Sequence, residues 1–177
     1  MTNYVYIATS IDGYIAGKDG DLSWLNEIPN PSNSDFGFSE FLSGIDALVM
    51  GRITFETVVS FGVWPYDKPV FVLSNSLDRV PGGFEDKVEI VNGDLKTVIA
   101  KLEERGMKNF YVDGGSVIRS FLKEDLIDEM IISRVPILLG DGVPLFGKME
   151  NRLKFKLVKT DSHDKTLVKC HYVRVRD

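Results

Sequence analysis

The fold is decided by a ten-residue segment, residues 47–56, whose sequence is ALVMGRITFE. Its first part, Ala47–Met50, is short, apolar and uncharged, which predicts a buried strand. Gly51 follows, and a residue without a side chain lets the backbone approach a ligand closely. The helix predicted next offers free N–H groups and the positive end of its dipole to a phosphate, and Arg52 and Thr54 add further donors. A tight turn with Thr54 as the helix cap explains the same residues, and this segment alone does not decide between the two interpretations.

Short apolar runs and helical patterns alternate along the rest of the chain. Strands are expected at Tyr4–Ala8, Ala47–Met50, Val70–Leu73, Val88–Val91, Phe110–Val112 and Met130–Val135. Helices are expected at Asp35–Ser43 and Thr54–Ser60, from Asp94 to a C-terminal cap at Gly106, and around Val117–Leu122. The tail, Phe155–Lys159 and Leu167–Val175 around a Ser162–Lys165 turn, has the pattern of an antiparallel hairpin. We therefore predict a single α/β domain over residues 1–177, with about four helices and about eight strands in a mostly parallel sheet.

Two further junctions between a strand and the next element carry residues suited to phosphate binding. Asp113-Gly114-Gly115-Ser116 precedes the last predicted helix, and its paired glycines permit close approach to a pyrophosphate. Ser74-Asn75 follows the strand at Val70–Leu73. In an open α/β sheet the carboxyl ends of parallel strands form one rim, so these junctions and Gly51 are expected side by side. The sequence therefore predicts a dinucleotide site on that rim.

Composition argues against several other classes of function. A formal net charge of −5 disfavours nucleic acid as the main partner, because phosphate binding needs clustered Lys and Arg. Cys170 is the single cysteine, so no intramolecular disulfide is expected, and without a recognisable leader the cytoplasm is the expected compartment. No apolar run approaches the ~18 residues of a membrane span. No His or Cys cluster has metal-ligand spacing, so no metal is expected.

These features together resemble the dihydrofolate reductase superfamily, through MGRITFE, the glycine pair before a helix and the order of elements. SIDGYIA at residues 10–16 and PILLGDGVPLF at residues 136–146 are more similar to a sister family. That family is the reductase domain of the bifunctional riboflavin-biosynthesis deaminase/reductase, with its stand-alone relatives. The resemblance runs from Tyr4 to Val175 and implies a dihydrofolate reductase-like fold. It also implies a homodimer that transfers hydride from NADPH to a small heterocycle such as 5-amino-6-(5-phosphoribosylamino)uracil.

The resemblance implies that NADPH lies along the rim. Its implied contacts are Ala8 and Ile15 at the nicotinamide carboxamide, Gly51, Arg52 and Thr54 at the pyrophosphate and 2′-phosphate, Ser74 and Asn75 at the adenosine phosphate, and Gly114, Gly115, Ser116 and Val117 on the other side of the pyrophosphate. The long irregular stretch Asp12–Ser34, which contains Trp24, would close over the nicotinamide and exclude water.

Asp35 is the candidate catalytic residue. It lies sixteen residues before Gly51, a spacing that matches the family's carboxylate for proton delivery to the substrate. The other interpretation is a carboxylate that stabilises the N-terminus of the first helix, and the sequence leaves both open. If Asp35 faces the substrate, burial is expected to raise its pKa more than the helix dipole lowers it.

Two departures from the family patterns bear on the substrate. Folate enzymes carry an arginine before the third strand for the glutamate tail, where this chain has Asp67-Lys68-Pro69. A lysine is a poor substitute for a bidentate carboxylate clamp. An arginine is often found after the glycine pair, where this chain has Ser116. Dihydrofolate reductase activity is therefore the disfavoured alternative, and a non-catalytic nucleotide-binding protein is the alternative from another class.

Overall fold

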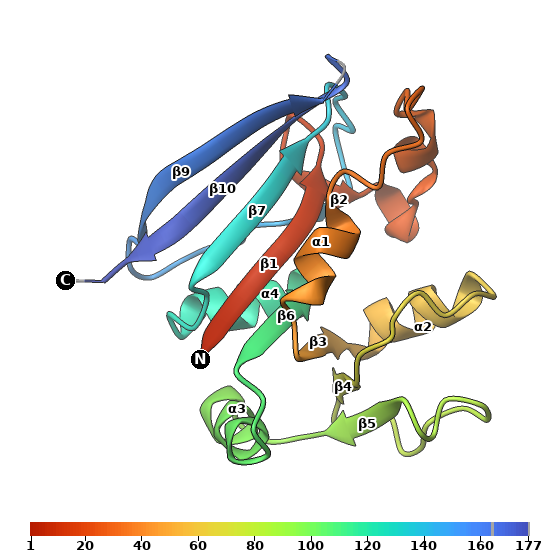
Figure 1. Ribbon diagram of the computed structural model, residues 1–177, viewed down its shortest axis with the longest axis vertical. Coiled ribbons are helices and arrows are strands. Elements are labelled where there is room, and N and C mark those ends of the chain that lie inside the picture. Colours follow the sequence, from red (N-terminus) through yellow and green to blue (C-terminus); the bar gives the residue numbers. More distant parts are fainter. Residues whose placement is uncertain (164, 177) are drawn as a thin grey trace.

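Figure 1 shows a computed structural model of the protein, which describes residues 1–163 and 165–176. The main sheet contains β1 (Thr2–Thr9), β3 (Ala47–Gly51), β4 (Val70–Leu73), β5 (Val88–Val91), β6 (Asn109–Asp113), β7 (Glu129–Arg134), β9 (Lys154–His163) and β10 (Leu167–Val175). Its eight strands lie in the order β5-β4-β3-β6-β1-β7-β10-β9. Neighbouring strands from β5 to β7 run parallel, whereas β10 runs antiparallel to both β7 and β9. The predicted fold class is confirmed, including the C-terminal hairpin; its predicted turn includes residue 164, which lies outside the described residues.

Four α-helices cover the two faces of this sheet, two on each face (Figure 1): α1 (Phe38–Ser43), α2 (Arg52–Ser60), α3 (Leu95–Glu104) and α4 (Gly115–Lys123). Apolar residues of α1 and α2, such as Leu42 and Phe55, are buried against one face. Those of α3 and α4, such as Leu102 and Phe121, are buried against the other. The strands between them are apolar on both sides because both faces are covered.

Two short strands form a small second sheet that was not predicted. β2 (Tyr14–Ala16) and β8 (Val143–Pro144) pair antiparallel, although more than a hundred residues separate them in the chain. They are too short to show a periodic pattern, so contacts made far along the chain define them. The stretch predicted to be irregular contains two short 3-10 helices, Lys18–Gly20 and Ser23–Glu27, and buries Trp24, whose exposure is 3%, against Val135 and Leu167.

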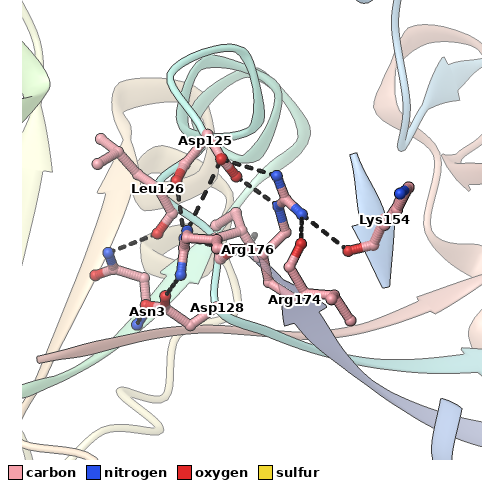
Figure 2. Close-up of polar contacts among 9 residues, drawn as sticks. Asn3, Asp125, Leu126, Asp128, Lys154, Arg174 and Arg176 are labelled. Carbon is pink, nitrogen blue, oxygen red and sulfur yellow. Dashed lines mark hydrogen bonds and ion pairs between the residues drawn. The ribbon is translucent and has the colours of Figure 1, made fainter. Parts of the chain in front are cut away.

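A network of charged side chains closes the end of the sheet where β1 begins and β10 finishes (Figure 2). Arg174 donates from Nε to Asp125 Oδ1 at 2.6 Å and from Nη2 to Oδ2 at 2.9 Å. Arg176 donates to Asp128 Oδ1 at 2.5 Å, and the other oxygen of Asp128 accepts from the backbone N–H of Asn3 at 2.7 Å. The network therefore ties the last strand to the loop before β7 and to the first strand.

Two kinds of feature are absent from the part of the chain that the structure describes. Its helices are all too short or too polar to cross a membrane. No group of three or more His, Cys, Asp or Glu side chains is arranged there to hold a metal ion.

Candidate functional site

The loops that follow the parallel strands meet along one rim, as the sequence predicts. Gly51 lies against α4, because a Cβ there would be 3.2 Å from Val117 Cγ2. Gly114 lies against α2 even more closely, since a Cβ on it would collide with the Thr54 hydroxyl. Its φ of 87° is a second reason for glycine at this position. The first turns of α2 and α4 thus come together around two glycines.

The structure shows whether Thr54 caps helix α2 or faces the rim. Helix α2 begins at Arg52 with Gly51 as its N-cap, so Thr54 lies three residues after the cap position. Its hydroxyl points instead toward Gly114, in the rim between the two helices. Thr54 as the helix cap is therefore wrong.

A cavity of about 210 Å³ opens at one end of the rim, between the ends of β4 and β5 and the start of α4. It brings together four of the residues expected around the adenosine and the pyrophosphate: Ser74, Asn75, Ser116 and Val117. Asn92, Gly93 and Ser120 also line it and were not predicted. Asn92-Gly93 follows β5 as Ser74-Asn75 follows β4, so the rule on carboxyl ends of parallel strands could have found it. The polar side chains, together with the apolar Leu73, Val91 and Leu95, suit a nucleoside, whose base is flat and whose sugar carries hydroxyl groups.

The opposite end of the rim is built from the SIDGYIA and PILLGDGVPLF segments. Asp12 accepts from the backbone N–H groups of Leu139 at 3.2 Å and Gly140 at 2.8 Å, and Ser10 donates to it at 2.6 Å. The Leu145 N–H donates to the Gly13 carbonyl at 2.9 Å. These bonds hold the two segments together as one unit. They also explain why both motifs occur in the same chain.

Ile15 is carried by this unit to the glycine pair. A Cβ on Gly115 would lie 2.8 Å from Ile15 Cδ1, so α4 and β2 are in contact there. Ala8 lies near the end of β1, half-buried beside the cluster that contains Trp24. The rim therefore runs from Ser74 past the two glycines to Ile15 without a gap.

Asp113 is a residue of the site to which no role was assigned from the sequence. It is the last residue of β6, half-buried, and its Oδ1 accepts from the Gly114 N–H at 2.8 Å. Burial raises the pKa of this carboxyl to about 6, and the hydrogen bonds from Gly114 and Tyr111 oppose that rise without cancelling it. Burial raises the pKa of the half-buried Tyr66 phenol, and the nearby Asp113 charge raises it further. A carboxyl with such a pKa can exchange protons near neutral pH.

Asp35 does not behave as expected. Its carboxylate is exposed and accepts from the backbone N–H groups of Gly37 at 2.8 Å and Ser39 at 2.9 Å. Hydrogen bonds to Ser39 and Gly37 lower its pKa to about 2, so the predicted rise is wrong. The expectation overestimated burial, because the chain before α1 turns at Phe36 and Gly37 and leaves Asp35 outside the core. In this structure Asp35 stabilises the turn into α1.

Arg52 is exposed and already has a partner. Its Nη1 lies 2.9 and 3.1 Å from the two carboxylate oxygens of Glu56, one turn further along α2. The ion pair is solvent-exposed, with 43% and 49% of the two side chains accessible. Glu56 engages Nη1 alone, so an anion at the rim that binds the other N–H groups of Arg52 shares this cation with Glu56.

Comparison with known proteins identifies relatives over the whole chain. The family model described as RibD C-terminal domain matches residues 4–169. The uncharacterized protein YwjB of Bacillus subtilis (strain 168) is 37% identical over 174 residues, which are 96% of each chain. The solved structure of a putative riboflavin biosynthesis protein from Shewanella sp. PV-4 has 54% identity and a TM-score of 0.97, over 99% of this chain and 100% of that one.

More distant structures share the fold. The diaminohydroxyphosphoribosylaminopyrimidine deaminase/5-amino-6-(5-phosphoribosylamino)uracil reductase of Thermotoga maritima has a TM-score of 0.75 at 18% identity, over 98% of this chain and 56% of that one. At such an identity the likeness concerns the fold alone, which is dihydrofolate reductase-like.

Proposed function

Because the chain belongs to the RibD C-terminal domain family, we propose that it is an NADPH-dependent reductase of a small heterocycle. One observation carries this proposal: the unbroken rim from Ser74, past Gly51 and Gly114, to Ile15. It combines a cavity with polar side chains at one end and a glycine-lined middle, which are the parts that a dinucleotide needs. Open α/β sheets bind nucleotides at this rim.

The residues present fit the cofactor. Gly114 and Gly115 have no Cβ, so Thr54, Ile15 and Arg119 approach the backbone where α4 begins closely. The free N–H groups of the first turn of α4 suit a pyrophosphate. Helix α4 has nine residues, so its free N–H groups and dipole add to the attraction for an anion. When bound, NADPH supplies the hydride. The chain itself supplies position and the proton.

Asp113 is the group we assign to proton delivery. Hydride addition to the carbon of a C=N or C=O bond leaves a pair of electrons on the heteroatom, which then takes a proton. The Asp113 carboxyl, with its pKa near 6, lies beside Gly114 at the centre of the rim and can give that proton. Its conjugate base is then reprotonated from solvent, which completes the exchange.

For the substrate we propose 5-amino-6-(5-phosphoribosylamino)uracil or a related pyrimidine. Membership in the RibD family supports this choice. Dihydrofolate reductase activity is the second candidate, and it is disfavoured because Lys68 stands where a folate enzyme needs an arginine. A nucleotide-binding protein without catalysis is the third candidate. Such a protein would bind a nucleotide along the rim, and the raised pKa of Asp113 would have no role in it.

A two-step experiment tests these candidates. A titration that follows nicotinamide fluorescence first measures NADPH binding. A panel of pyrimidines, pteridines and dihydrofolate is then screened for NADPH consumption. Turnover of the ribosylamino pyrimidine, with little turnover of dihydrofolate, is the expected result. Binding without any turnover would favour the non-catalytic protein, and no binding would overturn the proposal.

We propose in addition that the protein acts in the cytoplasm as a homodimer. The implied dimer rests on the resemblance to the riboflavin-biosynthesis reductases. Light scattering at micromolar concentration gives the molar mass directly, and a monomer's mass would contradict it.

A further inference from the structure

We infer that Arg119 binds the cofactor's pyrophosphate from the nicotinamide side of the rim. This inference rests on the proposed function and assigns a cation to a part of the site for which the sequence suggested none. Arg119 lies one turn into α4, and its Nη1 donates to the carbonyl oxygen of Pro144 in β8. The bond aims the guanidinium back toward the start of the helix.

Two glycines make room for this side chain. A Cβ on Gly115 would lie 2.8 Å from Arg119 Nη1, and a Cβ on Gly147 would lie 2.9 Å from Arg119 Cδ. The stem of Arg119 therefore packs on one glycine while the guanidinium lies against the other. Any larger residue at either position would displace it. The guanidinium is thus held at the glycine pair where α4 begins.

The charge of Arg119 has no counterion among the residues that the structure describes. The ion pairs formed there use Arg52, Arg105, Lys159, His171, Arg174 and Arg176. A half-buried guanidinium without a carboxylate is costly, because burial favours paired charges. Pro144 takes one of the five N–H groups that an arginine carries. The site is therefore electrostatically incomplete, and an anion would complete it.

The position of Arg119 on α4 identifies which part of the cofactor it meets. Ser116 and Ser120, one turn apart, line the cavity at the adenosine end. Gly115 and Arg119, also one turn apart, face the opposite way, toward Ile15 and β8. Residues four apart in the sequence lie on the same side of a helix. The two pairs therefore lie on different sides of α4, one at the adenosine end of the rim and one at the nicotinamide end. Arg119 is on the nicotinamide side, next to the free N–H groups that α4 offers to a pyrophosphate.

Cofactor fragments separate this role from that of Arg52. We expect Arg119→Gln to weaken NADPH, NADH and reduced nicotinamide mononucleotide by roughly tenfold or more, as for the loss of a charge-assisted contact. Adenosine 2′-phosphate should bind the variant as it binds the wild type, because it lacks the nicotinamide half. Arg52→Gln should show the reverse pattern, with weaker adenosine 2′-phosphate and unchanged nicotinamide mononucleotide. Arg105→Gln is the matched control, since Arg105 pairs with Glu89 at the far side of α3.

The outcomes are distinguishable. If the wild type binds neither NADPH nor NADH, the proposed function fails. If the wild type binds both and Arg119→Gln binds nicotinamide mononucleotide equally well, this inference alone is overturned. Should Arg119→Gln not fold, Arg119→Lys replaces it, because lysine keeps the charge and a stem but loses the fork of donors. In that variant, weaker binding of nicotinamide mononucleotide with unchanged binding of adenosine 2′-phosphate supports the role. Wild-type affinity for both fragments overturns it.

Discussion

Arg52 donates to both carboxylate oxygens of Glu56, at 2.9 and 3.1 Å, so the cation expected at a 2′-phosphate is held by its own helix. A phosphate that binds Arg52 competes with Glu56 for its positive charge and also meets the repulsion of the Glu56 carboxylate. If the 2′-phosphate of NADPH binds at Arg52 as proposed, we expect Glu56 to oppose it and to leave the rest of the cofactor unaffected. Its effect is specific to the nucleotide that carries the additional phosphate.

We predict that Glu56→Gln binds NADPH about two- to threefold more tightly, because an exposed pair of this kind is worth ~0.3–0.5 kcal/mol and repulsion is also relieved. NADH affinity should not change. Fluorescence titration of both nucleotides at low and high salt measures the two constants. Arg52→Gln should lower NADPH affinity by roughly tenfold and leave NADH unchanged. Equal shifts for the two nucleotides would place Glu56 and Arg52 away from the 2′-phosphate.

The second prediction compares two aspartates that differ in environment. Asp113→Asn should lower kcat by about 10²-fold with NADPH affinity intact, as expected when a general acid is lost. Asp35→Asn should keep wild-type kcat, because Asp35 is exposed at the turn into α1 and the Asn oxygen still accepts one of its two backbone N–H bonds. Steady-state kinetics on both variants provides the comparison. A large loss for Asp35→Asn and none for Asp113→Asn would exchange their roles.

The pH dependence of kcat/KM tests the same assignment, because the role of Asp113 fixes the direction of the change. Proton donation needs the protonated form of Asp113, whose pKa is about 6. The wild-type kcat/KM should therefore fall as pH rises above about 6, and Asp113→Asn should lack that descending limb. A profile that is flat from pH 5 to pH 8 in the wild type would contradict the assignment.

The third prediction concerns stability and follows from linkage. The pKa of Asp113 rises from an ordinary value of 3.8 to about 6 in the folded protein. Between these values the folded state keeps a proton that the unfolded state has lost, so stability falls as pH rises from about 4 to about 6. Asp113→Asn removes this penalty and should be more stable than wild type by about 1–3 kcal/mol at pH 7. Below pH 4 the difference should vanish, and denaturant unfolding at the two pH values measures it.

The sequence predicts the parts of this fold that are determined locally. Val70–Leu73 and Val88–Val91 were predicted to the residue, because the first is a continuous apolar run and the second a short β-branched run interrupted only by Glu89. The meeting of Gly51 with Gly114 on one rim follows from parallel strand order and needs no side-chain detail. Such features depend on neighbours in the chain or on topology alone.

Features that depend on distant contacts could not be predicted in this way. β2 and β8 lie in two segments that Asp12 holds together through the N–H groups of Leu139 and Gly140, more than a hundred residues away. The pKa of Asp113 depends on burial at the end of β6, and its position before Gly114 gives no sign of that burial. The predicted rise in the pKa of Asp35 depended on burial, which the spacing to Gly51 does not establish. The structure leaves it exposed and therefore gives the opposite sign.

The last prediction concerns the network in Figure 2, at the end of the sheet away from the rim. Arg174 is 10% exposed and makes two bonds to the Asp125 carboxylate, which lower the pKa of Asp125. A lowered carboxyl pKa contributes stability above the unfolded value near 4, and that stability is lost as pH falls through the folded pKa. Arg174→Ala should therefore cost roughly 1–3 kcal/mol at pH 7, since it leaves the carboxylate without its main partner. The deficit should shrink below pH 4, where protonation of Asp125 weakens the pair in the wild type as well.

Arg105→Ala breaks an exposed pair with Glu89 and should cost less than about 1 kcal/mol. Both variants should keep wild-type affinity for NADPH, because neither residue lies on the rim. Urea unfolding at pH 7 and pH 3.5, with a fluorescence titration at pH 7, measures all of these quantities. A wild-type midpoint for Arg174→Ala at pH 7 would show that the network contributes nothing to stability.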